Sequence, residues 1–484
     1  MRLRELLSDV PDVVRTRENN PNIRGIATHS GRVKEGDLFV ALSSDGSLPD
    51  RHPFIFQAVQ AGARAIVAER DVDVGDTAFV QTTDTHRALA HIAHRFYNKP
   101  SKQLKMIGVT GTNGKTSTVY LIRAVLNAAG LAPGLIGTIE HDLGITREIS
   151  HNSTPQAHDL HRMFRAMVDA SCRSAVMEVT SHGLAQNRVL GIDYEVAVFT
   201  NLTRDHLDYH NTPGAYLAAK ARLFDNLRSD AYAVVNTDDA ASKILMQKCS
   251  AHLLSYGRLE DATVRILEGS TSQGGTRLCL QTPRGKIDLE LALQGDFQLY
   301  NATAAVTAGL ALEIEPDIIA EALREIRIPG RFEGIDCGQN FGVFVDYAHA
   351  PDGLKNVLQT ARAFARGQLI CVFGCGGDRD KGKRPVMGGL SAKLADLSVV
   401  TSDNPRTEDP DAIIADILPG LGDAPHIVEP NRRRAIEKAI AKARAGDLVL
   451  IAGKGHENYQ ETNGIKAPFD DREVAREILE CKVG

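Results

Sequence analysis

The segment Gly108-Val-Thr-Gly-Thr-Asn-Gly-Lys-Thr-Ser-Thr118 constrains this chain more than any other feature. An apolar run at 105–109 predicts a buried strand, and apolar residues at helical spacing follow from 116 to 129. Gly111 and Gly114 allow a tight loop between them. A strand, a glycine loop and a helix N-terminus direct backbone N–H groups and the helix dipole at one point, which favours a phosphate group. The segment therefore predicts an α/β sheet that binds a nucleoside triphosphate.

Two side chains of this loop carry chemistry that a triphosphate needs. Lys115 adds a full positive charge beside the β- and γ-phosphates. The hydroxyl of Thr116 is an oxygen ligand suited to Mg²⁺. We therefore expect Mg²⁺ to accompany the nucleotide.

The composition excludes several other classes of protein. The 484 residues are enough for about three domains. The net charge of −5 gives no reason to expect a nucleic-acid or membrane partner. Seven scattered cysteines indicate reduced thiols, and no apolar run approaches the ~20 residues of a membrane helix. We expect a cytoplasmic protein whose partners are small molecules.

Strand and helix patterns alternate along the chain and divide it into three predicted α/β domains, at 1–100, 101–328 and 329–484. The first is small. The second and third predict mostly parallel sheets covered by helices on both faces, and the third is Rossmann-like. Between 252 and 294 the pattern becomes turn-rich, which predicts an antiparallel addition.

Polar side chains follow two strands of the predicted central sheet. Glu178 comes after the strand at 174–177, and His206 lies in the polar segment 200–210 after the strand at 196–199. A carboxylate or imidazole at a strand end beside a phosphate loop suits a metal ion. The alternatives are a helix cap at Glu178 and an ordinary polar loop at 200–210.

The predicted C-terminal sheet carries polar loops at the carboxyl ends of four strands, where ligands bind in doubly wound folds. Asp346 can accept hydrogen bonds from ribose hydroxyls. Pro405 stiffens its loop, and Arg406 offers a two-pronged donor for a carboxylate. The four loops are 346–351, 374–380, 403–406 and 453–457.

Together these segments resemble the Mur ligases, and they occur in family order along nearly the whole chain. The shared segments are Gly108–Thr116, Met177–Leu184, Phe199–His210, Pro329–Arg331, Val345–Pro351, Asp403–Arg406 and Gly453–Glu457. The resemblance implies an ATP-dependent amide ligase that acts on a UDP-N-acetylmuramoyl dipeptide ending in D-glutamate. It also implies that the first domain holds the UDP-sugar, the second ATP and the third the incoming amino acid, and we expect a monomer.

The resemblance assigns ligand contacts to particular positions. It implies ATP contacts at Gly111, Thr112, Asn113, Gly114, Lys115, Thr116, Ser117, Asn301, Arg331 and Asp346. It implies contacts with the UDP-substrate at Ser30, Asn152, Ser153, Thr154, Thr180, Gln186 and Arg188. The chain departs from the family pattern at 29–31, where His-Ser-Gly replaces Asp-Ser-Arg, and in the uridine-side loop 45–50, which carries extra residues and receives no assignment.

The resemblance further implies that Lys220 is carbamylated to N6-carboxylysine. Mg²⁺ binds oxygen, which an ammonium group lacks and a carbamate supplies as an anion. The implied metal ligands are Thr116, Glu178, His206 and carbamylated Lys220, and the implied catalytic residues are Lys115, Lys220, Glu178 and His206.

The incoming amino acid is expected to be meso-diaminopimelate, whose far end carries a second amino-carboxylate. The expected contacts are Arg379, Asp403, Asn404, Pro405, Arg406, Gly453 and Glu457. Alternatives are a lysine-adding Mur ligase, a ligase joining folate and glutamate, and a nucleotide sensor that has lost catalysis. It also stays open whether Arg406 only ties its loop to its own domain.

Overall fold

The computed structural model describes residues 1–17, 19–44, 46 and 49–483. It divides into two compact units, one of Met1–Arg265 with Ala304–Ile319 and the other of Ile266–Thr303 with Ala320–Gly484. Of the uridine-side loop at 45–50, Asp45, Ser47 and Leu48 lie outside the described residues. The three domain boundaries stay a prediction.

The first unit begins with a five-stranded sheet of order β1-β5-β4-β3-β2. All neighbouring pairs are parallel except β1 with β5. Apolar residues of its strands pack against helices on two sides to form two buried clusters. The elements are α1 (Leu3–Leu7), β1 (Val13–Arg17), β2 (Gly25–Ala27), β3 (Asp37–Val40), α2 (Ile55–Gln60), β4 (Ala65–Ala68), β5 (Ala78–Thr82) and α3 (Thr85–Phe96).

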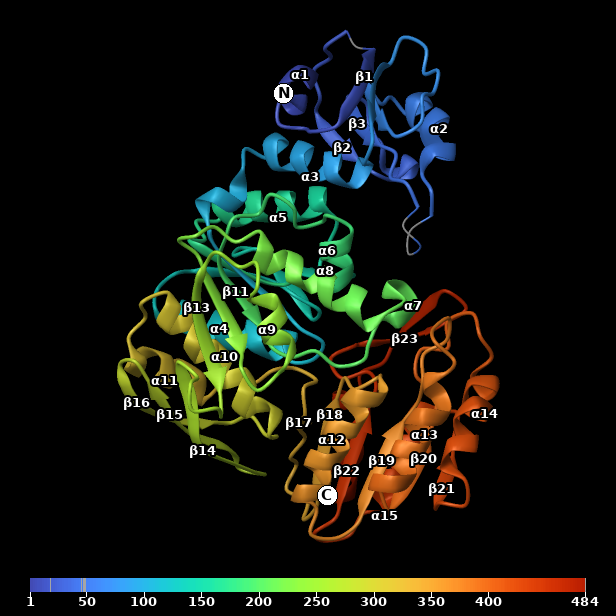
Figure 1. Ribbon diagram of the computed structural model, residues 1–484. Coiled ribbons are helices and arrows are strands. Elements are labelled where there is room, and N and C mark those ends of the chain that lie inside the picture. Colours follow the sequence, from blue (N-terminus) through green and yellow to red (C-terminus); the bar gives the residue numbers. More distant parts are fainter. Residues whose placement is uncertain (18, 45, 47–48, 484) are drawn as a thin grey trace. The chain divides into compact units, whose positions relative to one another are not determined.

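The same unit contains a second sheet, whose strands run in the order β13-β12-β11-β6-β10-β7-β8-β9. Figure 1 labels β11 and β13 of this sheet. The strands from β13 to β7 are parallel, and β8 and β9 add an antiparallel edge. The strands are β6 (Lys105–Thr110), β7 (Pro133–Ile136), β8 (Glu140–Asp142), β9 (Arg147–Ile149), β10 (Ser174–Glu178), β11 (Tyr194–Phe199), β12 (Tyr232–Asn236) and β13 (His252–Gly257). The helices are α4 (Lys115–Ala128), α5 (Ala157–Asp169), α6 (Ser181–Ala185), α7 (Leu207–His210), α8 (Pro213–Asp225) and α9 (Ala241–Leu245).

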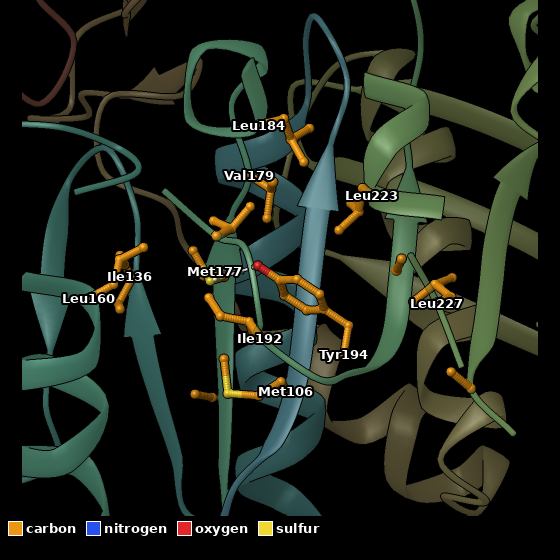
Figure 2. Close-up of a cluster of buried hydrophobic side chains, with 14 of the residues drawn as sticks. Met106, Ile136, Leu160, Met177, Val179, Leu184, Ile192, Tyr194, Leu223 and Leu227 are labelled. Atoms are coloured by element: carbon orange, nitrogen blue, oxygen red, sulfur yellow. Dashed lines mark hydrogen bonds between the residues drawn. The ribbon is translucent and has the colours of Figure 1, made fainter. Parts of the chain in front are cut away.

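One face of this sheet carries a buried cluster with Tyr194 near its middle (Figure 2). The Tyr194 hydroxyl donates a hydrogen bond to the Met177 sulfur at 3.3 Å. A Cβ at Gly108 would lie 2.7 Å from the Tyr194 ring, so the first glycine of the loop motif is needed for packing. The core therefore fixes the strand from which the phosphate loop leaves.

The antiparallel addition expected at 252–294 is only partly present, because β13 pairs with β12 in parallel. Helix α9 returns the chain before β13, which makes that pairing parallel. The end of β13 then pairs in parallel with the start of β14 (Val264–Ser272). In the second unit, β15 (Gly275–Thr282) and β16 (Gly285–Leu291) form the expected antiparallel hairpin.

The second unit also holds a six-stranded sheet of order β17-β18-β22-β19-β20-β21, parallel except for β17. The sheet is covered on both faces: α12, α13 and α14 supply one buried cluster, and α15 and α16 the other. The strands are β17 (Glu333–Gly334), β18 (Gly342–Asp346), β19 (Leu369–Phe373), β20 (Leu397–Val400), β21 (His426–Val428) and β22 (Leu448–Ala452), with a hairpin of β23 (Tyr459–Thr462) and β24 (Ile465–Pro468). The helices are α12 (Pro351–Phe364), α13 (Lys383–Leu394), α14 (Pro410–Leu421), α15 (Arg432–Lys442) and α16 (Asp471–Val483). Two more helices, α10 (Phe297–Ala311) and α11 (Pro316–Arg324), have residues in both units, because Ala304–Ile319 belongs to the first.

The predicted fold class, α/β with mostly parallel sheets, is confirmed. Within the described residues, each helix is too short or too polar to cross a membrane.

Candidate active site

The phosphate loop is held by close backbone packing against the segment that follows β11. Gly111 and Gly114 have φ angles of 149° and 85°, which side chains other than glycine's rarely allow. A Cβ on Gly111 would collide with the Thr200 hydroxyl. That hydroxyl donates to the Asn113 carbonyl at 2.7 Å, and the Asn113 N–H donates to Asn201 Oδ1 at 3.0 Å. The loop is thus shaped before any ligand arrives.

The side-chain nitrogens of two lysines meet at one carbonyl of this loop. Lys115 Nζ donates to the carbonyls of Gly111 at 2.9 Å and Thr112 at 2.8 Å. Lys220 Nζ, from α8, donates to the same Gly111 carbonyl at 2.9 Å and lies 4.6 Å from the centre of the Tyr216 ring. Lys220 is only 1% exposed. Burial, with a smaller contribution from Lys115, holds the pKa of Lys220 well below its ordinary value.

Glu178, at the end of β10, is a buried carboxylate beside the first turn of α4. The Thr116 hydroxyl donates to its Oε1 at 3.0 Å. The backbone N–H of Thr138 donates to Oε1 at 2.7 Å, and the Thr138 hydroxyl donates to Oε2 at 3.0 Å. The structure therefore brings Thr116 and Glu178 together as two oxygen donors, the ligand type that Mg²⁺ prefers.

His206 lies apart from these hydrogen bonds. It precedes α7 with a φ of 51°, its Nε2 is 3.5 Å from Asp205 Oδ2, and its ring is 4.8 Å from that of His182. Burial lowers the pKa of His206, which favours the neutral ring, the form that ligates metals. Among the described residues, no three His, Cys, Asp or Glu side chains converge as a metal site. Bound phosphate, water or a modified side chain would have to complete any magnesium shell.

Five residues predicted to bind the UDP-substrate form one network around Glu178. The Thr154 hydroxyl donates to the Glu178 carbonyl at 2.8 Å, and the Thr180 hydroxyl donates to Thr154 Oγ1 at 3.0 Å. Arg188 donates to the Thr154 carbonyl at 2.8 Å and to Gln186 Oε1 at 2.7 Å. In addition, the hydroxyls of Ser153 and Thr138 are 2.6 Å apart.

Ser30 and Asn152 have different surroundings. The Ser30 hydroxyl donates to Gln57 Oε1 at 2.8 Å, and Asn152 is exposed.

The three predicted nucleotide contacts outside the loop lie in the second unit. Asp346 is buried and accepts hydrogen bonds at 2.7 Å from the backbone N–H groups of Phe332 and Ala348. Burial raises its pKa to about 6. The Arg331 guanidinium lies 4.7 Å from the centre of the Tyr347 ring. Asn301 Nδ2 donates to Gln298 Oε1 at 3.1 Å.

We call residues 403–406 and 453–457 the C-terminal rim, since they follow β20 and β22. Arg406 donates to the Gly377 carbonyl at 2.6 Å, so its guanidinium contacts its own domain. Asn404 Nδ2 donates to Glu457 Oε2 at 2.8 Å. A Cβ on Gly453 would collide with Asp403 Oδ2. Pro405 is buried, whereas Arg379 is exposed.

Sequence reasoning missed three fully buried cations of the second unit, Lys454, Arg384 and Arg432, whose side chains are 0% exposed. Arg384 pairs with Glu408 and Asp416, and Arg432 pairs with Asp471. A helix arginine normally indicates a solvated face, so neither arginine gave a signal. Lys454 did give a signal in the sequence, because it lies between two glycines of a rim loop.

Two protein-family profiles match this chain. The profile of the Mur ligase middle domain matches residues 109–309, and that of the Mur ligase glutamate ligase domain matches 330–455. A curated relative from Syntrophomonas wolfei, UDP-N-acetylmuramoyl-L-alanyl-D-glutamate–2,6-diaminopimelate ligase, is 45% identical over 491 residues, which cover 100% of both chains.

Solved structures of Mur ligases are also similar to this chain. A structure of a ligase with the same name is 34% identical, covers 96% of each chain and superposes with a TM-score of 0.66. The MurF ligase of Thermotoga maritima in complex with ADP shares the fold, with a TM-score of 0.64, 18% identity and coverage of 95% of this chain and 98% of that one. Since the identity to the curated relative extends over the full length, this chain belongs to the Mur ligase family.

Proposed function

We propose that this protein is an ATP-dependent ligase that joins meso-2,6-diaminopimelate to the γ-carboxylate of D-glutamate in UDP-N-acetylmuramoyl-L-alanyl-D-glutamate. The observation that carries the proposal is the 45% identity over the whole chain to a ligase of that name. The reaction belongs to the synthesis of peptidoglycan precursors. The preformed phosphate loop and the polar C-terminal rim supply the two kinds of site that it requires.

The reaction proceeds in two steps. A γ-carboxylate oxygen attacks the γ-phosphorus of ATP, the bond to the β-phosphate oxygen breaks, and ADP leaves behind an acyl phosphate. The amine of diaminopimelate then attacks the acyl carbon, phosphate leaves, and the nitrogen loses a proton. Carboxylate and triphosphate repel each other, so the protein's main tasks are to align the reactants and neutralise their charge.

Lys115 performs part of that neutralisation. Its ammonium group now contacts two loop carbonyls, and a γ-phosphate oxygen is a stronger, charged acceptor for the same donor. Thr116 and Glu178 would hold Mg²⁺, which neutralises phosphate oxygens when bound. The other loop residues, together with Asn301, Arg331 and Asp346, are the proposed contacts of the nucleotide.

We also propose that Lys220 is carbamylated. A neutral amine is the form that attacks CO₂, and burial beside Lys115 favours the neutral amine. The nitrogen lone pair forms a bond to the carbon of CO₂, and the amine releases one proton. The product is an anionic oxygen donor next to Gly111, which would balance Lys115 and, with Thr116, Glu178 and His206, would hold Mg²⁺ when the ion is bound.

The C-terminal rim is the proposed site of diaminopimelate. Arg406 would exchange the Gly377 carbonyl for the distal carboxylate, which is charged and binds a guanidinium in a two-pronged manner. Asp403, Glu457 and the Gly453 carbonyl would accept from the distal ammonium. Arg379 is exposed and free to reach a carboxylate. Ser153, Thr154, Thr180, Gln186 and Arg188, with Ser30 and Asn152, are the proposed contacts of the UDP-substrate. We further propose a cytoplasmic monomer.

Phosphate release with a panel of amino acids tests this function. Release is expected only when ATP, the UDP-dipeptide and meso-diaminopimelate are all present, and the product should gain the mass of one diaminopimelate residue. Equal use of L-lysine would instead identify a lysine-adding ligase. Release without the UDP-dipeptide would indicate a nucleotide hydrolase or sensor.

A further inference from the structure

Lys454 is a buried cation at the centre of the C-terminal rim. Its Nζ donates to Asn404 Oδ1 at 3.1 Å and to Glu457 Oε2 at 3.0 Å. It also lies 5.4 Å from the centre of the Tyr459 ring. An ammonium group that is taken wholly out of water is costly unless its partners are well arranged. A lysine held in this way has a function beyond solubility.

These contacts fix the orientation of both neighbours. A lysine can only donate, so the atom of Asn404 that faces it must be the amide oxygen. That oxygen also accepts from the Glu461 N–H at 2.9 Å, and the amide nitrogen donates to Glu457 Oε2 at 2.8 Å. Glu457 Oε2 thus accepts from two donors, which hold the carboxylate in place.

Lys454 also sets the charge of the rim. Asp403 and Glu457 are both carboxylates, and Asp403 Oδ2 is buried without a hydrogen-bond partner among the described residues. Burial would raise the pKa of Asp403, but Lys454 and Arg432 outweigh burial and keep it below its ordinary value. Arg432 is itself paired with Asp471 at 2.7 and 2.8 Å. Arg432 also lies 4.0 Å from Asp403 Oδ2, so its charge is shared between Asp471 and Asp403. Lys454 contacts Glu457 directly and offsets carboxylate charge of the rim.

We propose that Lys454 is a positioning and specificity-determining residue of the amino-acid pocket. It fixes Asn404 and Glu457 and offsets one carboxylate charge, which favours a zwitterionic amino-carboxylate over a bare ammonium group at the far end of the substrate. The inference rests on the proposed function, because it concerns the choice between diaminopimelate and lysine. A more negative pocket would attract the cationic end of lysine and weaken binding of the distal carboxylate.

Lys454→Met tests the proposal, since methionine keeps the length of the side chain and removes its charge and donors. The ratio of kcat/KM for meso-diaminopimelate to that for L-lysine is expected to fall by about tenfold or more. The KM for ATP should stay within about twofold. The matched control is Lys466→Met, because Lys466 is exposed, lies 4.1 Å from the centre of the same Tyr459 ring and should leave the ratio unchanged. An equal loss with both amino acids would overturn the proposal.

Glu457→Gln and the double variant Lys454→Met/Glu457→Gln show whether Lys454 acts through Glu457. If it does, the double variant keeps the amino-acid ratio of Glu457→Gln within about twofold, whereas a further tenfold fall would overturn the proposal. This comparison also tests the proposal if Lys454→Met alone fails to fold. The double variant loses one positive and one negative charge, so it leaves no buried carboxylate of Glu457 without its cation. The proposed function is judged separately, by whether the wild type uses diaminopimelate at all.

Discussion

The phosphate loop and the C-terminal rim handle buried charge in opposite ways. At the loop, the side-chain nitrogens of Lys115 and Lys220 share the Gly111 carbonyl, a neutral acceptor. At the rim, Lys454 contacts Glu457, and Arg432, outside the rim loops, contacts Asp471. The loop thus gathers two lysine side chains at a neutral acceptor, whereas the rim is nearly balanced before a ligand binds.

The difference follows from the ligands expected at each place. A triphosphate brings several negative charges, and a site that is positive in advance binds it without rearranging. An amino acid with a zwitterionic end brings no net charge there, so a balanced site recognises it by the geometry of donors and acceptors. Removing a cation from the loop should therefore abolish turnover, whereas removing a cation from the rim should change the choice between amino acids.

Lys115→Ala should have the largest effect. Loss of the charge beside the transferring phosphoryl group is expected to lower kcat by roughly 10³-fold, on the scale of losing one preorganised donor. Steady-state phosphate release at saturating ATP measures it, and thermal unfolding should remain close to the wild type. Lys105→Ala, in the same strand–loop region but exposed and paired with Glu195, is the control and should be neutral. Near-normal turnover in Lys115→Ala would break the comparison.

Lys220→Arg should come next, with a loss of about 10²-fold or more in turnover, because arginine keeps the positive charge but does not form a stable carbamate. Wild-type protein in ¹³C-bicarbonate should show a carbamate carbonyl signal that the variant lacks. Lys243→Arg, in the short helix α9, controls for the substitution itself. A wild type with no carbamate signal and full activity would show that Lys220 acts as a buried amine.

Arg406→Ala should act on the rim alone. Its KM for meso-diaminopimelate is expected to rise about 100-fold, as for loss of a charge-assisted pair to a carboxylate, while the KM for ATP changes less than about twofold. Arg433→Ala, an exposed arginine paired with Glu477, serves as the control. If the two KM values rose together, Arg406 would serve its own domain, as its contact with Gly377 allows.

The sequence predicted the loop better than the rim, and the physical reason is locality. Gly111, Gly114 and Lys115 lie within five consecutive positions, and a strand–loop–helix pattern specifies their geometry. The rim joins residues about fifty positions apart, and its central cation, Lys454, becomes buried only when β20 and β22 lie in one sheet. Likewise, burial of Arg384 and Arg432 depends on tertiary packing that helical periodicity does not specify.

The smallest effect concerns stability, which limits the pH range over which both sites can be compared. His161, on α5, is fully buried, stacks on His94 at 5.0 Å, and has no hydrogen-bond partner for either ring nitrogen within the described chain. Burial lowers its pKa to about 3, whereas an unfolded histidine titrates near 6.5. Between pH 3 and 6.5, this histidine is therefore protonated in the unfolded chain and neutral in the folded chain.

The contribution of His161 is therefore fully present above pH 6.5 and is lost as the pH falls toward 3. Linkage gives a loss of about 2 kcal/mol in the free energy of unfolding between pH 6.5 and 5. His161→Leu should remove that share of the pH dependence while leaving kcat at pH 7.5 unchanged. Urea unfolding of both proteins at several pH values measures it, and parallel curves would mean that His161 does not titrate on unfolding. If His161→Leu removes a loss of turnover that the wild type shows below pH 6, that loss reports unfolding. The pH dependence of turnover that persists in the variant then belongs to the loop and the rim.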